Sequence, residues 1–261
     1  MYRASCSIAA IVSTLTLIYS GLKTTTTDPD LSPGELQVIS KSHINYPQSL
    51  VFVLGSTLAI SLHSFCSLYM YEIVNKECHI LQCITGKRSL PLLSNRTFLF
   101  FTLVILPLIG NLNFPLLAVY SLENAFVEHW VVAAVFALCA TMEMVTITAV
   151  LHTNLEQIDE LAVANKLSPS FEMTTLSSIP SISFKWFSAL LCALGIGSYF
   201  YFRRPCFTNQ NLCYYYVGGQ YLSVIAIFLF RLSFLKEMTP KLYQLQTGRS
   251  SIPVISPSAY P

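Results

Sequence analysis

The sequence predicts an all-α membrane protein, a bundle of six transmembrane helices, because it carries few charges and contains six long apolar stretches. Hydrophobic residues make up 53% of the 261 residues and charged residues only 11%, whereas soluble domains carry roughly 25% charged residues. In lipid, each backbone polar group must be paired within the protein, so apolar stretches of this length are expected to be helical. The expected spans are residues 4–22, 49–71, 97–119, 127–151, 184–202 and 215–235.

The first expected span has a second interpretation. Residues 1–22 combine a short basic start with an apolar core, as a secretory signal peptide does. The apolar run is longer than a usual signal core, and the small-residue cleavage pattern after it is poor. These features favour an uncleaved signal anchor, with a cleaved signal peptide as the alternative.

The distribution of basic residues predicts the orientation of the bundle. With the N-terminus in the cytosol, ten lysines and arginines fall on the inner side, counting Lys185 at the start of the fifth span, and four fall on the outer side. The positive-inside rule then places both termini in the cytosol and the loop 120–126 in the lumen or outside the cell. The only glycosylation sequon, at Asn95, would face the cytosol and stay unmodified.

The six spans are expected to form one domain, residues 1–238. The run "HTNLEQIDELAVANKL", residues 152–167, has apolar residues at helical spacing and is expected to continue the fourth helix beyond the bilayer. Residues 239–261 contain prolines among small polar residues and are expected to form a disordered cytosolic tail.

The signatures of soluble enzymes are absent from the sequence. It contains no Gly-Lys-Ser/Thr phosphate loop, no Gly-x-Ser-x-Gly elbow and no His-Glu-x-x-His motif. We identify no catalytic residue and expect no metal, no cofactor and no nucleic-acid partner. Whether the protein is an enzyme is left open by these patterns.

Polar residues inside the expected spans form the first candidate site, an intramembrane cluster of His63, Glu143 and Arg231. Each would cost several kcal/mol in hydrocarbon unless it found a partner. At 1.5 Å per residue, His63 and Glu143 both lie roughly 12 Å from the inner boundary, and Arg231 lies roughly 6 Å deep. We therefore expect an ion pair between Glu143 and Arg231 with His63 beside it. Its role is either to lock helices together, with Arg231 reaching the lipid phosphates, or to support catalysis or proton transfer.

The third expected span contains the unusual run "ILPLIGNLNFPLL", residues 105–117. Pro107, Gly110 and Pro115 predict a kink whose freed carbonyl groups need partners. Two asparagines, Asn111 and Asn113, lie between the prolines. They either satisfy the kink and bond to neighbouring helices or line a polar cavity for lipid headgroups.

A second candidate site is predicted where lumenal segments converge. Its residues come from the loop after the third span, the start of the fourth span, the loop after the fifth span and the third span itself: Glu123, Asn124, Glu128, His129, Arg203, Arg204 and Asn113. Adjacent arginines could bind a phosphate-bearing headgroup through charge-assisted hydrogen bonds. The alternative is ordinary anchoring and solvation at the headgroup level.

Six of the eight cysteines fall into two groups. Cys206 and Cys213 share the lumenal loop before the last span, where they form either a disulfide or two free thiols. Four cysteines inside the spans are interpreted as small packing residues: Cys6, Cys66, Cys139 and Cys192.

Short sequence matches resemble the post-GPI-attachment-to-proteins factor two family of six-span membrane proteins. The matches are the Glu-Asn-Ala-Phe run at 123–126, the segment "VISKSHINYPQSLVF" at 38–52, the "LHS" element at 62–64, and a Cys-containing outer loop before an aromatic-rich last span. That family includes the N-terminal region of the yeast cell-wall-biogenesis remodelling protein and is related to the damage-regulated autophagy modulators. The likeness covers roughly residues 36–238. The chain lacks the Pro-x-Arg element often found in the second span, and it has Gln220-Tyr221 where the last span often carries an acidic residue.

The resemblance implies a Golgi or ER protein that acts in lipid remodelling of glycosylphosphatidylinositol (GPI) anchors, at the step that restores an acyl chain. Its implied partners are membrane lipids and GPI-anchored proteins. A second interpretation is a non-enzymatic membrane modulator of the autophagy or plasma-membrane type, resident in the lysosome or plasma membrane. A third is a proton-coupled transporter that uses His63 and Glu143.

Overall fold

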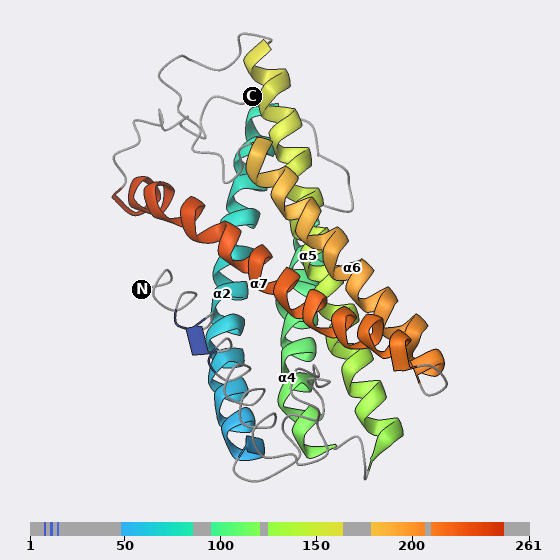
Figure 1. The fold of residues 1–261 in the computed structure, drawn as a ribbon. Coiled ribbons are helices and arrows are strands. Elements are labelled where there is room, and N and C mark those ends of the chain that lie inside the picture. Colours follow the sequence, from blue (N-terminus) through green and yellow to red (C-terminus); the bar gives the residue numbers. More distant parts are fainter. Residues whose placement is uncertain are drawn as a thin grey trace.

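The computed structural model describes residues 8, 11, 12, 15, 48–85, 95–120, 125–163, 179–206 and 210–247. From residue 48 onward, nearly all of the described chain is helical (Figure 1). The elements are α2 (Gln48–Thr85), α3 (Arg96–Phe100), the π-helix η1 (Phe101–Ile105), α4 (Leu106–Val119), α5 (Phe126–Val163), α6 (Ile179–Cys206) and α7 (Gln210–Thr247).

Five helical segments of the described chain are long and apolar enough to cross a membrane. They are Leu50–Lys76, Arg96–Leu117, Val127–Gln157, Ser181–Phe202 and Tyr214–Phe234. Five of the six expected spans are therefore confirmed as apolar helices, and their length and composition are those of a multi-pass membrane protein. The expected first span lies almost wholly outside the described residues.

Two helices extend beyond the expected spans. The prediction that the fourth helix continues past the bilayer is confirmed, because α5 reaches Val163. Helix α7 continues to Thr247, so the expected start of a disordered tail at 239 is wrong. Of the four prolines in residues 239–261, three lie after residue 252 and Pro240 lies within α7, and residues 241–247 include the good helix formers Lys, Leu and Gln.

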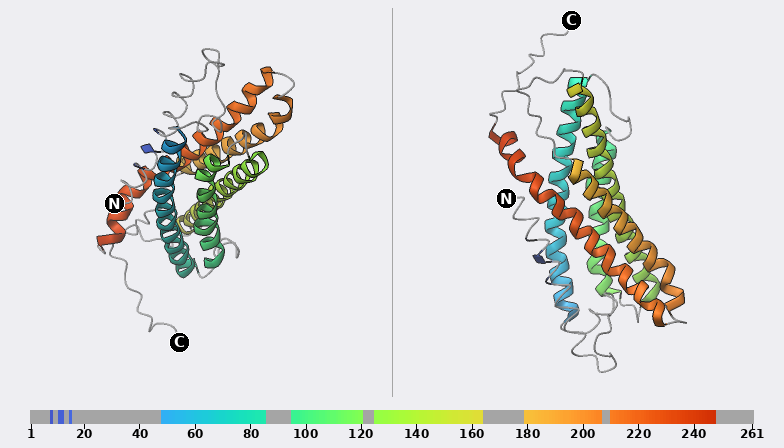
Figure 2. Two further views of the ribbon diagram at one scale, coloured as in Figure 1. Left: turned by 90° about the horizontal axis from the view of Figure 1, so that it is seen from below. Right: turned by 45° about the horizontal axis from the view of Figure 1, so that its top comes forward.

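Successive helices reverse direction, so the chain forms an up-and-down bundle (Figure 1). The starts of α2, α5 and α7 lie at the same end as the ends of α4 and α6; we call this the 120–125 end, after the α4–α5 connection. Helices α6 and α7 pack against each other, α4 packs against both α5 and α2, and α5 also contacts α6. Helix α7 crosses the bundle obliquely (Figure 2). None of its Cα atoms lies within 8 Å of one in α2.

Two glycines allow α6 and α7 to touch backbone to backbone. A Cβ atom on Gly195 would lie 2.8 Å from the Gly219 carbonyl oxygen, and one on Gly219 would lie 2.6 Å from the Gly195 carbonyl oxygen. Small residues permit this kind of close helix approach in membranes. The contact determines where α7 sits against the rest of the bundle.

The third span contains the π-helix η1, which ends at the first residue of the run in which a kink is expected. Pro107 lacks an N–H group and lies at the start of α4, and the preceding Leu106 N–H donates to the Phe101 carbonyl. The Thr102 hydroxyl donates to the Phe98 carbonyl at 2.8 Å, and Asn113 Nδ2 donates to the Ile109 carbonyl at 2.7 Å. Side chains within the same segment thus supply hydrogen bonds to backbone carbonyls around the π-helix.

Candidate functional site

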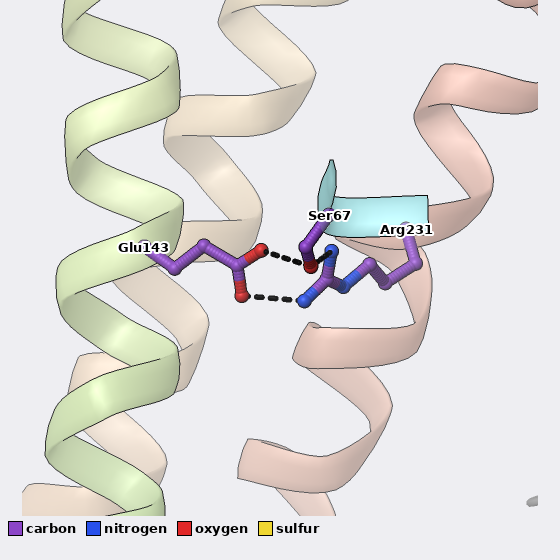
Figure 3. Close-up of polar contacts among 3 residues, drawn as sticks. All are labelled: Ser67, Glu143 and Arg231. Carbon is purple, nitrogen blue, oxygen red and sulfur yellow. Dashed lines mark hydrogen bonds and ion pairs between the residues drawn. The ribbon is translucent and has the colours of Figure 1, made fainter. Parts of the chain in front are cut away.

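Three helices meet at an ion pair inside the bundle (Figure 3). Arg231 on α7 pairs through Nη2 with Oε2 of Glu143 on α5. Ser67 on α2 donates to Glu143 Oε1 at 3.1 Å and accepts from Arg231 Nη1 at 3.3 Å. The ion pair expected between Glu143 and Arg231 is present, and Ser67 is a third member that sequence reasoning missed. Its one signal was its position four residues after His63, on the same face of the helix.

Burial makes this pairing necessary. The side chain of Glu143 is 3% exposed and that of Arg231 is 12% exposed. An isolated charge at such a position would cost several kcal/mol, whereas a hydrogen-bonded pair is electrically neutral. Because α2 and α7 have no close backbone contact, the bond between Ser67 and Arg231 is a side-chain link between two helices whose backbones lie apart.

A pocket lies against this cluster and is lined by α2, α4, α5 and α7. Its empty volume is about 680 Å³, including the space at its open side. Its polar lining residues are His63, Asn111, Glu143 and Arg231, and its other walls are apolar. We call it the polar pocket. The three residues of the expected intramembrane cluster thus share one pocket, with Asn111 as a fourth member.

Asn111 and Asn113 have different environments although they are two residues apart. Asn113 bonds to the carbonyl of its own helix, as one of the two alternatives expected. Asn111 lines the polar pocket, and its Nδ2 atom is buried without a hydrogen-bond partner in the described part of the chain. A buried amide of this kind is costly unless something else accepts its hydrogen bond.

A second pocket lies next to the first, toward the 120–125 end. Its empty volume is about 670 Å³, including the space at its open side, and its lining is largely apolar apart from His129, Tyr199, Gln220 and Ser223. We call it the apolar pocket. Four apolar side chains line both pockets: Phe114, Phe136, Val224 and Ile227.

His129 is buried, contrary to the expectation that it is solvated at the membrane surface. Its side chain is only 1% exposed, and its Nδ1 atom lies 2.6 Å from the Tyr120 carbonyl oxygen. Glu128 beside it is exposed, because successive helical residues point about 100° apart. The idea that Glu128 and His129 share one solvated site is therefore wrong.

The remaining lumenal candidates are not brought together within the described residues. Glu123 and Asn124 lie outside them. Arg203 and Arg204 belong to the end of α6 rather than to the expected loop, because the helix continues to Cys206; their side chains lie outside the described part of the structure. Asn113 is not among the lining residues of either pocket. The headgroup site stays a prediction.

The cysteines give one correction. Cys66 is disulfide-bonded, so its interpretation as a packing thiol is wrong, and its partner lies outside the described residues. Cys139 and Cys192 are free and buried, as expected for packing residues. Cys206 ends α6 and Cys213 lies in the first turn of α7, and their side chains are outside the described set. Within the described ranges, no group of three or more His, Cys, Asp or Glu residues could hold a metal ion.

An aromatic cluster surrounds Tyr199 near the 120–125 end. The ring of Tyr199 stacks on Trp130 at 5.9 Å and on Tyr216 at 4.8 Å between centroids. Its hydroxyl is buried without a hydrogen-bond partner among the residues described. Tyr199 lies three residues before Phe202, where the span ends, so the cluster matches the aromatic belt that membrane proteins place at the lipid–water interface.

The polar pocket offers hydrogen-bond donors and acceptors in an otherwise apolar surrounding, and the apolar pocket offers space for hydrocarbon. Comparisons of the chain with protein-family models, with curated proteins and with solved structures gave no match.

Proposed function

We propose that this protein takes part in remodelling the lipid portion of GPI anchors in the ER or Golgi, with membrane lipids and GPI-anchored proteins as its partners. The observation that carries the proposal is the position of His63. This residue belongs to the "LHS" element of the family resemblance, and it lines a pocket in the bundle together with Glu143 and Arg231.

The chemistry of the pocket supports a lipid substrate. Its walls are mostly apolar, with a few polar groups on one side, which is the usual make-up of a site for an amphiphilic ligand. Ionisable groups inside a membrane segment are costly and are usually retained for function. A neutral histidine supplies one hydrogen-bond donor and one acceptor, so His63 can bind either a hydroxyl or a carbonyl group of a lipid.

Deletion of the gene tests the proposal. We expect the amount of GPI-anchored protein at the cell surface to fall and the acyl composition of the anchors to change, and we expect reintroduction of the intact chain to restore both. Flow cytometry of a GPI-anchored reporter and mass spectrometry of released anchor lipids measure the two effects. If neither changes in the deletion strain, the proposal is abandoned.

A proton-coupled transporter is a further candidate, and the π-helix in the third span favours it. The π-helix η1 and Pro107 precede Asn111, which lines the pocket beside His63 and Glu143, and π-helical turns often occur at functional sites. Proton flux into liposomes that contain the purified protein distinguishes the two. A flux that is lost in His63→Ala would favour transport.

A further inference from the structure

The polar and apolar pockets are adjacent, because the same four side chains line both, and we treat them as the two halves of one slot. One wall of the slot follows α5 from His129 to Glu143 and contains the small residues Ala133, Ala137 and Ala140. These ends are fourteen residues apart in the sequence, which corresponds to roughly 21 Å along a helix. The hydrocarbon core of a bilayer is roughly 30 Å thick, about 15 Å for each leaflet. The slot is therefore long enough for a single acyl chain.

The polarity of the slot gives it a direction. The residues of the slot that carry a charge at neutral pH, Glu143 and Arg231, lie at the end formed by the polar pocket, together with His63. In the apolar pocket, His129 already contacts the Tyr120 carbonyl. An amphiphile gains most when its polar group lies in the polar pocket and its hydrocarbon lies in the apolar pocket.

Asn111 identifies the chemistry of the polar group. Its buried Nδ2 atom lacks an acceptor among the described residues, so a ligand carbonyl at this point would complete its hydrogen bonding. Because Glu143 and Arg231 neutralise each other, the pocket favours an uncharged acceptor, such as an ester or amide, over a carboxylate. The Tyr199 hydroxyl, in the apolar pocket, is also buried without a partner among the described residues. It lies within about one helical turn of the end of its span, where water and headgroups are within reach.

We propose that the slot binds one acyl chain of an uncharged ester or amide lipid, with the carbonyl accepting a hydrogen bond from Asn111 and the chain filling the apolar pocket. The inference rests on the proposed function, because it takes a membrane lipid as the ligand. It adds the class of the bound group and the residues that hold each end.

Photocrosslinking tests the proposal on the purified full-length protein in phosphatidylcholine nanodiscs. The probe is a fatty acid methyl ester with a diazirine in its chain, and the matched probe is the alkyl methyl ether of the same length, which lacks the carbonyl. We expect the ester to label Phe114, Phe136 and Ile227. Labelling confined to lipid-facing residues such as Leu138, which is 61% exposed, would overturn the proposal.

Two asparagine variants test the polar end. Asn111→Leu should lower ester labelling in the slot about fivefold, the loss expected for one neutral hydrogen bond, and bring it to the level of the ether. Asn113→Leu is the control, because its amide bonds to its own helix, and it should label as the unmodified protein does. Equal slot labelling by the ester and the ether in the unmodified protein would contradict the role of Asn111.

Two tryptophan variants test the apolar end. Ala137→Trp places a large ring in the apolar pocket and should abolish slot labelling, whereas Leu138→Trp on the lipid-facing side of the same helix should not. Ala133→Trp serves as a second filling variant if Ala137→Trp fails to give a monodisperse protein. Unchanged slot labelling in a monodisperse filling variant would overturn the proposal.

The outcomes separate this inference from the proposed function. Altered anchor lipids in the deletion strain, together with no slot labelling, would leave the proposed function standing and refute the slot. Slot labelling together with unaltered anchor lipids would support acyl binding and refute the role in GPI remodelling.

Discussion

The carboxylate of Glu143 and the guanidinium of Arg231 form an ion pair between α5 and α7, and the hydroxyl of Ser67 joins both to α2. This contact neutralises two charges that the membrane would not tolerate separately. It also links α2 to α7, which have no close backbone contact. The same pair forms one side of the polar pocket, so the stability of the bundle and the chemistry of the pocket depend on the same residues.

The first prediction concerns the ion pair. Glu143→Gln or Arg231→Met alone leaves a buried charge without its partner and should lower the free energy of unfolding by about 3–5 kcal/mol. The double variant removes both charges and should recover a large part of that loss. Thermal unfolding of the purified protein in detergent measures the effect. A double variant no more stable than either single variant would show that the two residues do not interact.

Ser67 should contribute less. Ser67→Ala removes a hydroxyl that bonds to both members of the ion pair, and we expect a loss of about 1–3 kcal/mol because the charged groups lose a partner. Ser61→Ala on the same helix is the control, since its hydroxyl is exposed and bonds only to the Thr57 carbonyl. Equal stability of the two variants in the same unfolding assay would argue against a role for Ser67.

The neighbouring residues Gly218 and Gly219 of α7 allow a matched pair of variants that tests the contact between α6 and α7. A Cβ atom at Gly219 would overlap the Gly195 carbonyl oxygen and the Tyr199 amide nitrogen, whereas a Cβ atom at Gly218 meets nothing within 4 Å. Gly219→Ala should therefore destabilise the protein by about 1–3 kcal/mol through overpacking. Gly218→Ala should leave the melting temperature unchanged or raise it, because alanine favours a helix over glycine. Similar melting temperatures for the two variants would refute the close backbone contact.

His129 should stabilise the α4–α5 connection. His129→Phe removes its hydrogen bond to the Tyr120 carbonyl and should cost about 1–3 kcal/mol because that carbonyl loses its partner. Glu128→Ala alters an exposed side chain and should be nearly neutral. Hydrogen exchange of the amides at the start of α5 should rise in the first variant only, and equal exchange in both would contradict the bond.

Orientation and location can be tested in cells. The positive-inside rule places Asn95 in the cytosol, so the protein should not change mobility after glycosidase treatment; a glycan on Asn95 would overturn this topology. A fluorescently tagged chain should colocalise with Golgi or ER markers. Residence in the lysosome or plasma membrane would instead favour the non-enzymatic modulator.

The sequence predicted the features that any chain needs in order to cross the hydrocarbon core of a membrane, namely apolar helices and paired charges. Five spans could be predicted because apolar length alone makes a membrane helix, and Glu143 could be paired with Arg231 because isolated intramembrane charges are so costly. Ser67 could not be predicted, since a serine satisfied by its own helix and a serine that bridges two charges have the same sequence signal.

Two other features were missed for a common reason: hydropathy does not show which side of a helix faces the interior of the bundle. Nearly every face of the third span is apolar, so hydropathy could not show that Asn111 faces the polar pocket while Asn113 bonds within its own helix. The position of His129 near a span boundary suggested solvation, yet the start of α5 at Phe126 turns it inward. The extent of α6 placed Arg203 and Arg204 in a helix instead of a loop, because helices continue beyond the apolar core that hydropathy detects.

The central claim is that His63 acts on a membrane lipid from within the polar pocket, and the acyl composition of GPI anchors tests it most directly. The deletion strain would carry either His63→Ala or His79→Ala, a matched change to an exposed histidine on the same helix, at equal protein levels. Mass spectrometry of released anchors should show that His79→Ala restores the normal acyl chains and His63→Ala does not. Full restoration by His63→Ala would contradict the account.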